Sequence, residues 1–174
     1  MKPAVKIMVL AALVVAVGVM MKHETIKNVL SPRGIRNHNP GNIRRSADNW
    51  QGLSPVQNDP QFFQFIGPEW GIRAMMRILV NYQDRHGLNT IRGIISRWAP
   101  PNGVDANGQP YSQNTESYIQ HIARAAGVGA DDPISVVAMA GRIVPAMIRH
   151  ENGQQPYSDP ILKAGIELGG GVWA

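Results

Sequence analysis

One carboxylate and a group of amides are the side chains of this sequence that are best suited to chemistry. Glu151 lies just beyond the apolar residues 146–148, at the end of a predicted helix. A second segment, residues 37–43 with the sequence NHNPGNI, is rich in asparagine. Glycosidic cleavage needs a carboxylic acid with a raised pKa, and it needs amide and aromatic side chains that hold the sugars. The combination favours carbohydrate chemistry.

The position of Glu151 predicts a carboxyl group that keeps its proton. A carboxylate at a helix C-terminus faces the negative end of the helix dipole. Ile148, with Trp50 or Tyr157, is expected to shield it from water. Both effects raise the pKa, as a general acid requires. The simpler interpretation is that Glu151 lies at a solvated helix end with Gly153 as its left-handed cap. The resemblance described below favours a catalytic role for Glu151.

Other carboxylates and the histidines are weaker candidates. Glu69 and Glu116 lie in the first turns of predicted helices, where the dipole favours acidic residues. Asp59 is either a second carboxylate of the site or a turn residue. Asp131 and Asp132 are better explained by helix capping than by metal binding, and the five histidines lack HExxH spacing. We therefore expect no metal and no cofactor.

The composition indicates a folded chain and excludes several kinds of site. The 174 residues include 17 Lys plus Arg and 12 Asp plus Glu, so the formal net charge is +5, and 44% are hydrophobic. That apolar content excludes a disordered tail protein. Cysteine is absent, which excludes disulfides, thiolate zinc sites and cysteine nucleophiles. A basic surface suits polyanions, although ordinary solubility explains the charge equally well; nucleic-acid motifs are absent, so nucleic acid is not an expected partner.

Hydrophobic spacing and helix breakers predict a mainly helical chain that positions these residues. The expected helices start at Pro68, near Thr90, at Thr115, at Ile134 and at Pro160, and they stop at Gly87, Pro100, Gly127, about His150 and Gly169. Residues 61–66 (QFFQFI) predict a short strand or hairpin arm, whereas 35–60 and 99–113 read as polar loops. The predicted fold class is mainly α with a small β hairpin.

The first residues form an apolar segment. Residues 7–21 are uninterrupted apolar and are flanked by lysines. Such a run suffices for a transmembrane helix if the flanking lysines extend toward the headgroups. We interpret it as a membrane anchor; an uncleaved signal peptide is the second choice, and a buried core helix is the third. The predicted domains are a membrane anchor with a juxtamembrane helix, 1–30, and a soluble domain, 31–174.

Several ordered motifs resemble a known family. The segment RGIRNHNPGNIRRSADNWQG begins at Arg33, and D-x-x-F-F-x-F begins at Asp59. They are followed by EWGIRAMMRILVNY, TIRGIISRWAPP and NTESYIQHI. From about Arg33 to Tyr157 the chain resembles small phage virion-associated proteins, which are described as structural or as peptidoglycan-degrading and lysozyme-like. The resemblance implies a lysozyme-like fold.

The resemblance also points to Glu151. In lytic transglycosylases and related glucosaminidases, the catalytic Glu ends a buried helix in a pattern like apolar-x-x-E-S-G, and an Asn-rich segment follows in many glucosaminidases. Here Glu151-Asn152-Gly153 is similar to that helix end, with Asn152 where Ser is common. The Asn-rich segment comes earlier in this chain. We therefore expect a circularly permuted order, in which the helix end faces the Asn-rich loop across a cleft.

Four residues are candidates for substrate binding. Asn39 and Asn42 carry amides that suit the amide groups of sugars, although NPGN equally builds a turn. Tyr118 has the spacing of a buried helix face, yet an aromatic residue often lines the sugar groove in lysozyme-like folds. Tyr157, which is also expected to shield Glu151 from water, is the fourth candidate.

The expected function is cleavage of peptidoglycan glycan strands during phage entry. Glu151 would protonate the glycosidic oxygen; the absence of an obvious partner carboxylate favours a lytic transglycosylase over a muramidase. The alternatives are a non-catalytic virion protein that uses the same fold as a scaffold or wall-binding module, and an internal basic protein that contacts packaged DNA. The expected partners are peptidoglycan, a lipid membrane and other virion proteins, and the expected location is a virion membrane, with activity in the bacterial envelope.

Overall fold

Helices account for most of the ordered elements of the chain. The computed structural model describes residues 30–104 and 108–173. The chain divides into two units, Met1–Pro32 and Arg33–Ala174, and the labelled elements belong to the second unit. In order they are α2 (Arg33–Arg36), α3 (Pro68–His86), α4 (Ile91–Trp98), β1 (Asn102–Val104), β2 (Pro110–Ser112), α5 (Thr115–Ala126), α6 (Ala140–Asn152) and α7 (Asp159–Leu168).

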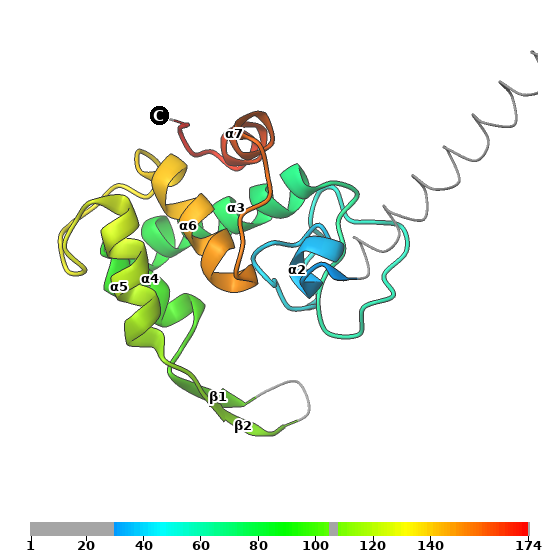
Figure 1. Ribbon diagram of the computed structural model, residues 1–174, viewed down its shortest axis with the longest axis horizontal. Coiled ribbons are helices and arrows are strands. Elements are labelled where there is room, and N and C mark those ends of the chain that lie inside the picture. The colour runs from blue at the N-terminus through cyan, green and yellow to red at the C-terminus, as the bar shows by residue number, and fades with distance from the viewer. Residues whose placement is uncertain (1–29, 105–107, 174) are drawn as a thin grey trace, which may run out of the picture. The chain divides into compact units, whose positions relative to one another are not determined.

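Helix α3 contacts α4, α6 and α7 and carries much of the main core (Figure 1). It begins with a proline, whose missing N–H is not needed at the first helical position. It ends before Gly87, which adopts φ 64°, a conformation that glycine reaches without steric cost. Ile72, Met75, Met76 and Leu79 have helical spacing and are fully buried. This predicted helix and its apolar face are confirmed.

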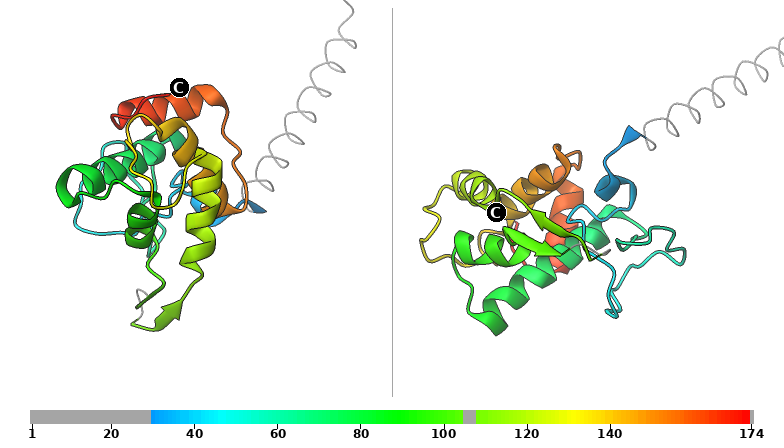
Figure 2. Two further views of the ribbon diagram at one scale, coloured as in Figure 1. Left: turned by 90° about the vertical axis from the view of Figure 1, so that its left-hand side faces the viewer. Right: turned by 90° about the horizontal axis from the view of Figure 1, so that it is seen from below.

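Helix α7 packs closely against α3 (Figures 1 and 2). A Cβ added at Gly165 would lie 2.6 Å from the Cβ of Ile72, and one added at Gly169 would lie 2.5 Å from the Cβ of Met76. Larger residues at these two positions would push the helices apart, because packed interiors have little room to adjust. The predicted last helix is confirmed, and its glycines set its distance from α3.

Helix α5 packs against both α4 and α6. Its buried side is formed by residues with helical spacing, including Tyr118, Ile119 and Ile122. Ile95 of α4 and Ile143 of α6 belong to the same hydrophobic core cluster. The packing of these three helices therefore determines where the ends of α4 and α6 lie relative to α5.

The start of α5 differs in detail from the prediction. Asn114, not Thr115, is the N-cap, and its side chain accepts a hydrogen bond of 2.9 Å from the backbone N–H of Ser117. The hydroxyl of Thr115 is buried and donates instead to the carbonyl of Ala99, at 2.6 Å. Thr115 thus ties the start of α5 to the end of α4, which a local capping signal does not reveal.

Helix α6 begins at Ala140. The sequence predicted a start at Ile134, and this prediction is wrong. The backbone N–H of Ile134 donates to the carbonyl of Asn89, and that of Val136 donates to the side-chain oxygen of Gln83, both at 2.8 Å. Both N–H groups thus have acceptors outside a helix, from residues far along the chain. The segment before α6 is therefore held against the α3–α4 connection.

The hairpin is present, but its predicted position is wrong. β1 and β2 pair antiparallel, with Gly103 opposite Tyr111, in the segment that was predicted to be a polar loop. Figures 1 and 2 show these strands extending away from the helices. Residues 61–66 form only isolated bridges, which pair Phe62 with Arg44 and Phe65 with Leu53. The neighbouring Phe63 is buried in a second hydrophobic cluster, so the apolar run marks core residues rather than a hairpin.

The predicted fold class also included an N-terminal transmembrane helix, and this part is corrected. Among the residues that the structure describes, no helix is long and apolar enough to cross a membrane. The segment for which the span was predicted, residues 7–21, lies outside the described residues. The observed fold class is therefore mainly helical with a two-stranded antiparallel sheet.

Candidate functional site

A surface cavity of about 610 Å³ lies where distant parts of the chain meet. The Asn-rich loop contributes residues 41–43 and is followed by Arg44, the end of α4 contributes Trp98, and the end of α6 contributes Glu151. Its other lining residues are Arg33, Phe62, Ile78, Tyr82, Ala99, Tyr111 and Gln113. The cavity is within the size range of ligand sites in proteins, and aromatic side chains surround a single carboxyl group.

Glu151 lies in the last turn of α6 and is held by three side chains from other segments. The indole Nε1 of Trp98 donates to Oε1 at 2.8 Å, and the hydroxyl of Tyr118 donates to the same oxygen at 3.0 Å. The amide Nδ2 of Asn42 donates to Oε2 at 3.3 Å. The helix end therefore faces the Asn-rich loop, although 109 residues separate Asn42 from Glu151.

The surroundings of Glu151 favour its protonated form. Burial raises the pKa of the carboxyl group, and the three hydrogen bonds lower it by a smaller amount, so that the pKa stays above its ordinary value. The three donors are neutral, so none of them stabilises the negative charge as a cation would. The C-terminal end of α6 acts in the same direction, because the helix dipole disfavours a negative charge there.

Tyr118 is buried on α5 and does not line the cavity. Its ring stacks on the imidazole of His150, with centroids 3.6 Å apart and planes 9° from parallel. Burial and the neighbouring Glu151 raise the pKa of its hydroxyl well above the usual value, so it remains a donor to that carboxyl group. Its position is that of a support for Glu151, and its predicted contact with substrate stays a prediction.

The two asparagines named from the sequence occupy different places. Asn42 lines the cavity in a left-handed conformation, φ 49°. Asn39 is fully buried; its Nδ2 donates to the carbonyls of Ile43 and Phe63, and its Oδ1 accepts from the N–H of Ile43, all at 2.9 Å. Asn39 thus shapes the loop that presents Asn42.

Tyr157 and Trp50, named as aromatic neighbours of Glu151, do not line the cavity. Tyr157 packs against the main core, and Trp50 packs against the cluster around Phe63. The hydroxyl of Tyr157 and the indole N–H of Trp50 are buried without a hydrogen-bond partner among the described residues. The structure therefore does not place these two residues at the site, and Trp98 supplies the aromatic contact instead.

Trp98, Tyr111 and Gln113 line the cavity but were not singled out as site residues in the sequence. Trp98 has core spacing, and its one distinguishing signal is its place at a helix end before Pro100. Tyr111 and Gln113 lie in the region that was predicted to be a loop, yet both line the cavity. A Cβ added at Gly103 would lie 2.6 Å from the Tyr111 hydroxyl, so glycine leaves room for this ring on the hairpin.

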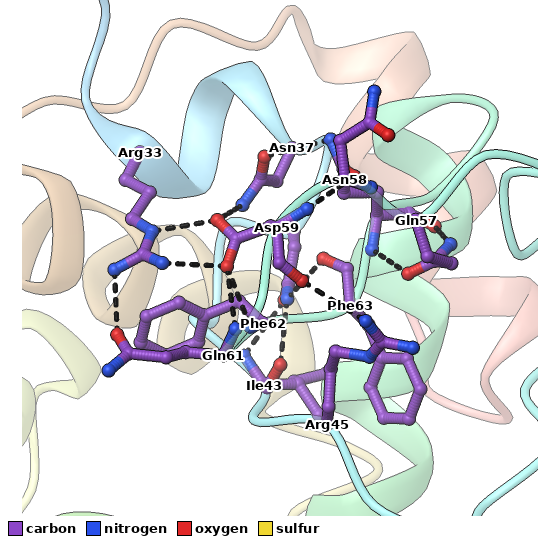
Figure 3. A network of polar contacts seen from close by, with 12 residues as sticks. Arg33, Asn37, Ile43, Arg45, Gln57, Asn58, Asp59, Gln61, Phe62 and Phe63 are labelled. Carbon is purple, nitrogen blue, oxygen red and sulfur yellow. Dashed lines mark hydrogen bonds and ion pairs between the residues drawn. The ribbon is translucent and has the colours of Figure 1, made fainter. Parts of the chain in front are cut away.

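Asp59 lies outside the lining of the cavity and is fully engaged by other groups (Figure 3). Its carboxylate accepts two hydrogen bonds of 2.7 Å from the guanidinium of Arg33 and one of 2.7 Å from the amide of Asn37. The backbone N–H groups of Gln61 and Phe62 donate to it at 2.9 Å. The Arg33 guanidinium holds the pKa of Asp59 well below its usual range. Asp59 thus organises a turn.

The described part of the chain offers no cluster of three or more His, Asp or Glu side chains that could hold a metal ion. No protein-family model matches the chain. The chain is 37% identical over 157 residues to Protein P5 of Pseudoalteromonas phage PM2, and the match covers 88% of this chain and 91% of the phage protein. This likeness confirms the phage part of the resemblance. By this extent of identity, the chain belongs to the family of Protein P5 of Pseudoalteromonas phage PM2.

Proposed function

We propose that this protein cleaves the glycan strands of peptidoglycan by a lytic-transglycosylase-type reaction, as a virion-associated protein that assists phage entry alongside other virion proteins. One observation carries the proposal: a carboxyl group lines a cavity, is shielded from water, and is held by neutral donors. A raised pKa favours the protonated form from which a general acid acts. The phage relative supports the virion setting.

The two oxygens of Glu151 have different partners, which favours Oε2 as the reactive one in the proposed mechanism. Oε1 accepts from both Trp98 and Tyr118, whereas Oε2 accepts only the longer hydrogen bond from Asn42. The proposed mechanism places the acidic proton on Oε2, the oxygen with fewer donors. In the first step that proton moves to the glycosidic oxygen, and the C1–O bond breaks with its electron pair on the leaving sugar.

The same carboxyl group completes the reaction. Glu151, now a carboxylate, accepts the proton of the C6 hydroxyl of the same sugar, whose oxygen bonds to C1. The product is a 1,6-anhydro sugar, and Glu151 regains its proton. Negative charge on Glu151 is brief, and the hydrogen bonds from Trp98, Tyr118 and Asn42 stabilise it while it lasts.

The cavity lining favours this route over hydrolysis. Hydrolytic glycosidases use two carboxyl groups, about 5–5.5 Å apart when they retain and about 6.5–9.5 Å apart when they invert the anomeric configuration. Glu151 is the one carboxylate among the described residues that line the cavity. Asp59 is tied to Arg33, Asn37 and two backbone N–H groups, so it has no lone pair to spare for water.

A digest of cell-wall sacculi tests the proposal. The full chain, the Glu151→Gln variant and the control Glu167→Gln would be incubated with Gram-negative sacculi, and the products would be identified by mass spectrometry. Glu167 is an exposed residue of α7 and lies away from the cavity lining. We expect anhydro-muropeptides from the wild type and the control, and about 10²–10⁴-fold fewer from Glu151→Gln.

Two other outcomes would overturn the proposal in different ways. Products with free reducing ends would mean hydrolysis and a muramidase mechanism. Absence of product from a correctly folded wild-type chain would favour the non-catalytic alternative, a scaffold or wall-binding virion protein with the same fold.

A further inference from the structure

We infer that Arg44 and Phe62 form a carboxylate-binding subsite at the cavity, which selects glycans that carry carboxylates over neutral glycans. The inference rests on the proposed function, because it takes the ligand of this cavity to be a cell-wall glycan. Both residues line the cavity together with Glu151.

The local backbone places Arg44 and Phe62 side by side. They form an isolated antiparallel bridge, supported by hydrogen bonds from the N–H of Arg45 to the carbonyl of Gln61, 2.8 Å, and from the N–H of Phe63 to the carbonyl of Ile43, 3.1 Å. Residues directly opposite each other in such a pair project to the same face. The Arg44 guanidinium carbon lies 5.4 Å from the centroid of the Phe62 ring, a cation–π distance that orients its planar group.

The Phe62 ring is itself held from a second direction. The guanidinium carbon of Arg33 lies 4.6 Å from its centroid. Arg33 is fixed by both oxygens of Asp59 and by the side-chain oxygen of Gln61, at 2.7–2.9 Å (Figure 3). The ring against which Arg44 rests is therefore held in place by contacts within the protein itself.

The charges around the cavity leave Arg44 without compensation. The charge of Arg33 is balanced by Asp59, to which it is ion-paired at 2.7 Å. Arg44 is exposed and makes no ion pair within the described parts of the chain. Glu151 is hydrogen-bonded to Trp98, Tyr118 and Asn42, and it forms no ion pair with Arg44. Among the described residues that line the cavity, Arg44 is the one guanidinium without an ion-pair partner, and its fork of N–H donors matches the two oxygens of a carboxylate.

Carboxylates distinguish peptidoglycan from neutral amino-sugar polymers. Muramic acid carries a lactyl ether that ends in a carboxyl group. That group is either free or linked to a stem peptide, which brings carboxylates of its own. Chitin has the same β-1,4 backbone and N-acetyl groups but no carboxylate. A guanidinium in the same cavity as Glu151 would therefore favour peptidoglycan and fix which sugar occupies which side of Glu151.

Binding to an inactive background tests the inference separately from catalysis. Glu151→Gln would be combined with Arg44→Gln, with Arg44→Lys, or with the control Arg124→Gln, an exposed residue of α5 that does not line the cavity. The probes are intact sacculi, glycan strands freed of stem peptides by an amidase, and chitin hexasaccharide. Folding of each variant would be checked by thermal unfolding.

We expect Arg44→Gln to weaken binding to a carboxylate-bearing probe about tenfold or more, as loss of a charge-assisted hydrogen bond implies. Arg44→Lys should recover part of the loss, and Arg124→Gln and chitin binding should be unchanged. If Arg44→Gln weakens binding to sacculi alone, the ligand of Arg44 is a stem-peptide carboxylate. If it also weakens binding to the freed glycan strands, the ligand is the lactyl carboxylate. Equal losses for Arg44→Gln and Arg124→Gln, or an equal loss on chitin, would overturn the subsite. Arg44-dependent binding without any product from the wild type would instead overturn the proposed catalysis alone.

Discussion

Asp59 and Glu151 are two carboxyl groups of one helical unit that are both shielded from water, yet their pKa values move in opposite directions. Asp59 is held by the guanidinium of Arg33 and by an amide and two backbone N–H groups. Glu151 is held by an indole, a phenol and an amide, all neutral. Asp59 accepts five hydrogen bonds and Glu151 accepts three, but the difference in kind is that only Asp59 has a cation among its donors.

The difference shows how one kind of side chain serves two purposes. A cation lets a shielded carboxylate stay charged, so Asp59 fixes the turn around Phe62 and has no capacity left for chemistry. Neutral donors orient a carboxyl group without taking its proton, so Glu151 can release that proton to a ligand. The stronger interactions, those of Asp59, thus have a structural role. The weaker ones hold Glu151, the group proposed to react.

Neutralising Asp59 has the largest expected effect on stability. Asp59→Asn removes the charge that pairs with Arg33 and turns an N–H₂ group toward donors that need an acceptor. We expect the free energy of unfolding at pH 7 to fall by about 2–4 kcal/mol, measured by urea denaturation. The control is Glu116→Gln, whose exposed carboxylate pairs with Arg92 and should leave stability unchanged. Wild-type stability in Asp59→Asn would show that the network is not structural.

The two carboxyl groups are also expected to affect the free energy of unfolding at opposite ends of the pH range. The pKa of Asp59 is lowered on folding, so its stabilisation is present above its unfolded value of about 3.9 and is lost as the pH falls toward the folded pKa. The pKa of Glu151 is raised, so its contribution is present below its unfolded value of about 4.3 and is lost as the pH rises through the folded pKa.

Unfolding measured from pH 2 to 9 checks these signs. Asp59→Asn should flatten the decline of stability on the acid side, and Glu151→Gln should flatten the decline that begins above about pH 4.3. If both variants flattened the same limb, the opposite assignments of the two groups would be wrong.

The helices could be predicted because the spacing of apolar residues is a local signal, as in α3 and α7. The starts of α5 and α6 depend on partners far along the chain. Thr115 bonds to the carbonyl of Ala99, and Val136 bonds to the side chain of Gln83. The hairpin was missed because its strands, NGV and PYS, contain Gly, Pro and Asn, which have low strand propensity.

Part of the site could be predicted, because a sequence motif indicated which distant segments come together. Glu151 and the Asn-rich loop were expected to face each other, and Asn42 does contact the carboxyl group. Trp98 and Tyr118 were indistinguishable from core residues, because each has helical spacing and a large apolar ring. Only the packing of α4 and α5 against α6 reveals that their polar atoms converge on Glu151.

Removing one neutral donor should change the titration of Glu151 without disturbing its position. Tyr118→Phe keeps the ring that stacks on His150 but deletes the hydroxyl that donates to Oε1. The lost hydrogen bond is worth about 1 kcal/mol, and it favours the charged form. The pKa of Glu151 should therefore rise further, and the alkaline limb of the pH–rate profile should move to higher pH.

The same change at Tyr157, which does not line the cavity, provides the control. Tyr157→Phe also removes a phenolic hydroxyl, but this hydroxyl has no hydrogen-bond partner among the described residues and does not line the cavity. Its alkaline limb should coincide with that of the wild type. A shift of equal size in both variants would mean that Tyr118 acts through general packing rather than through its hydrogen bond.

The smallest expected effect is that of Glu151→Gln on stability, and it completes the comparison with Asp59→Asn. Glutamine can keep its oxygen toward Trp98 and Tyr118 and turn its N–H₂ toward Asn42, whose amide can rotate to accept. No cation loses its partner, so the free energy of unfolding should be unchanged or higher by up to about 1 kcal/mol at neutral pH. A loss as large as that of Asp59→Asn in the same denaturation experiment would contradict this. It would mean that Glu151 is charged and structural in the folded protein, and its assignment as the proton donor would fail.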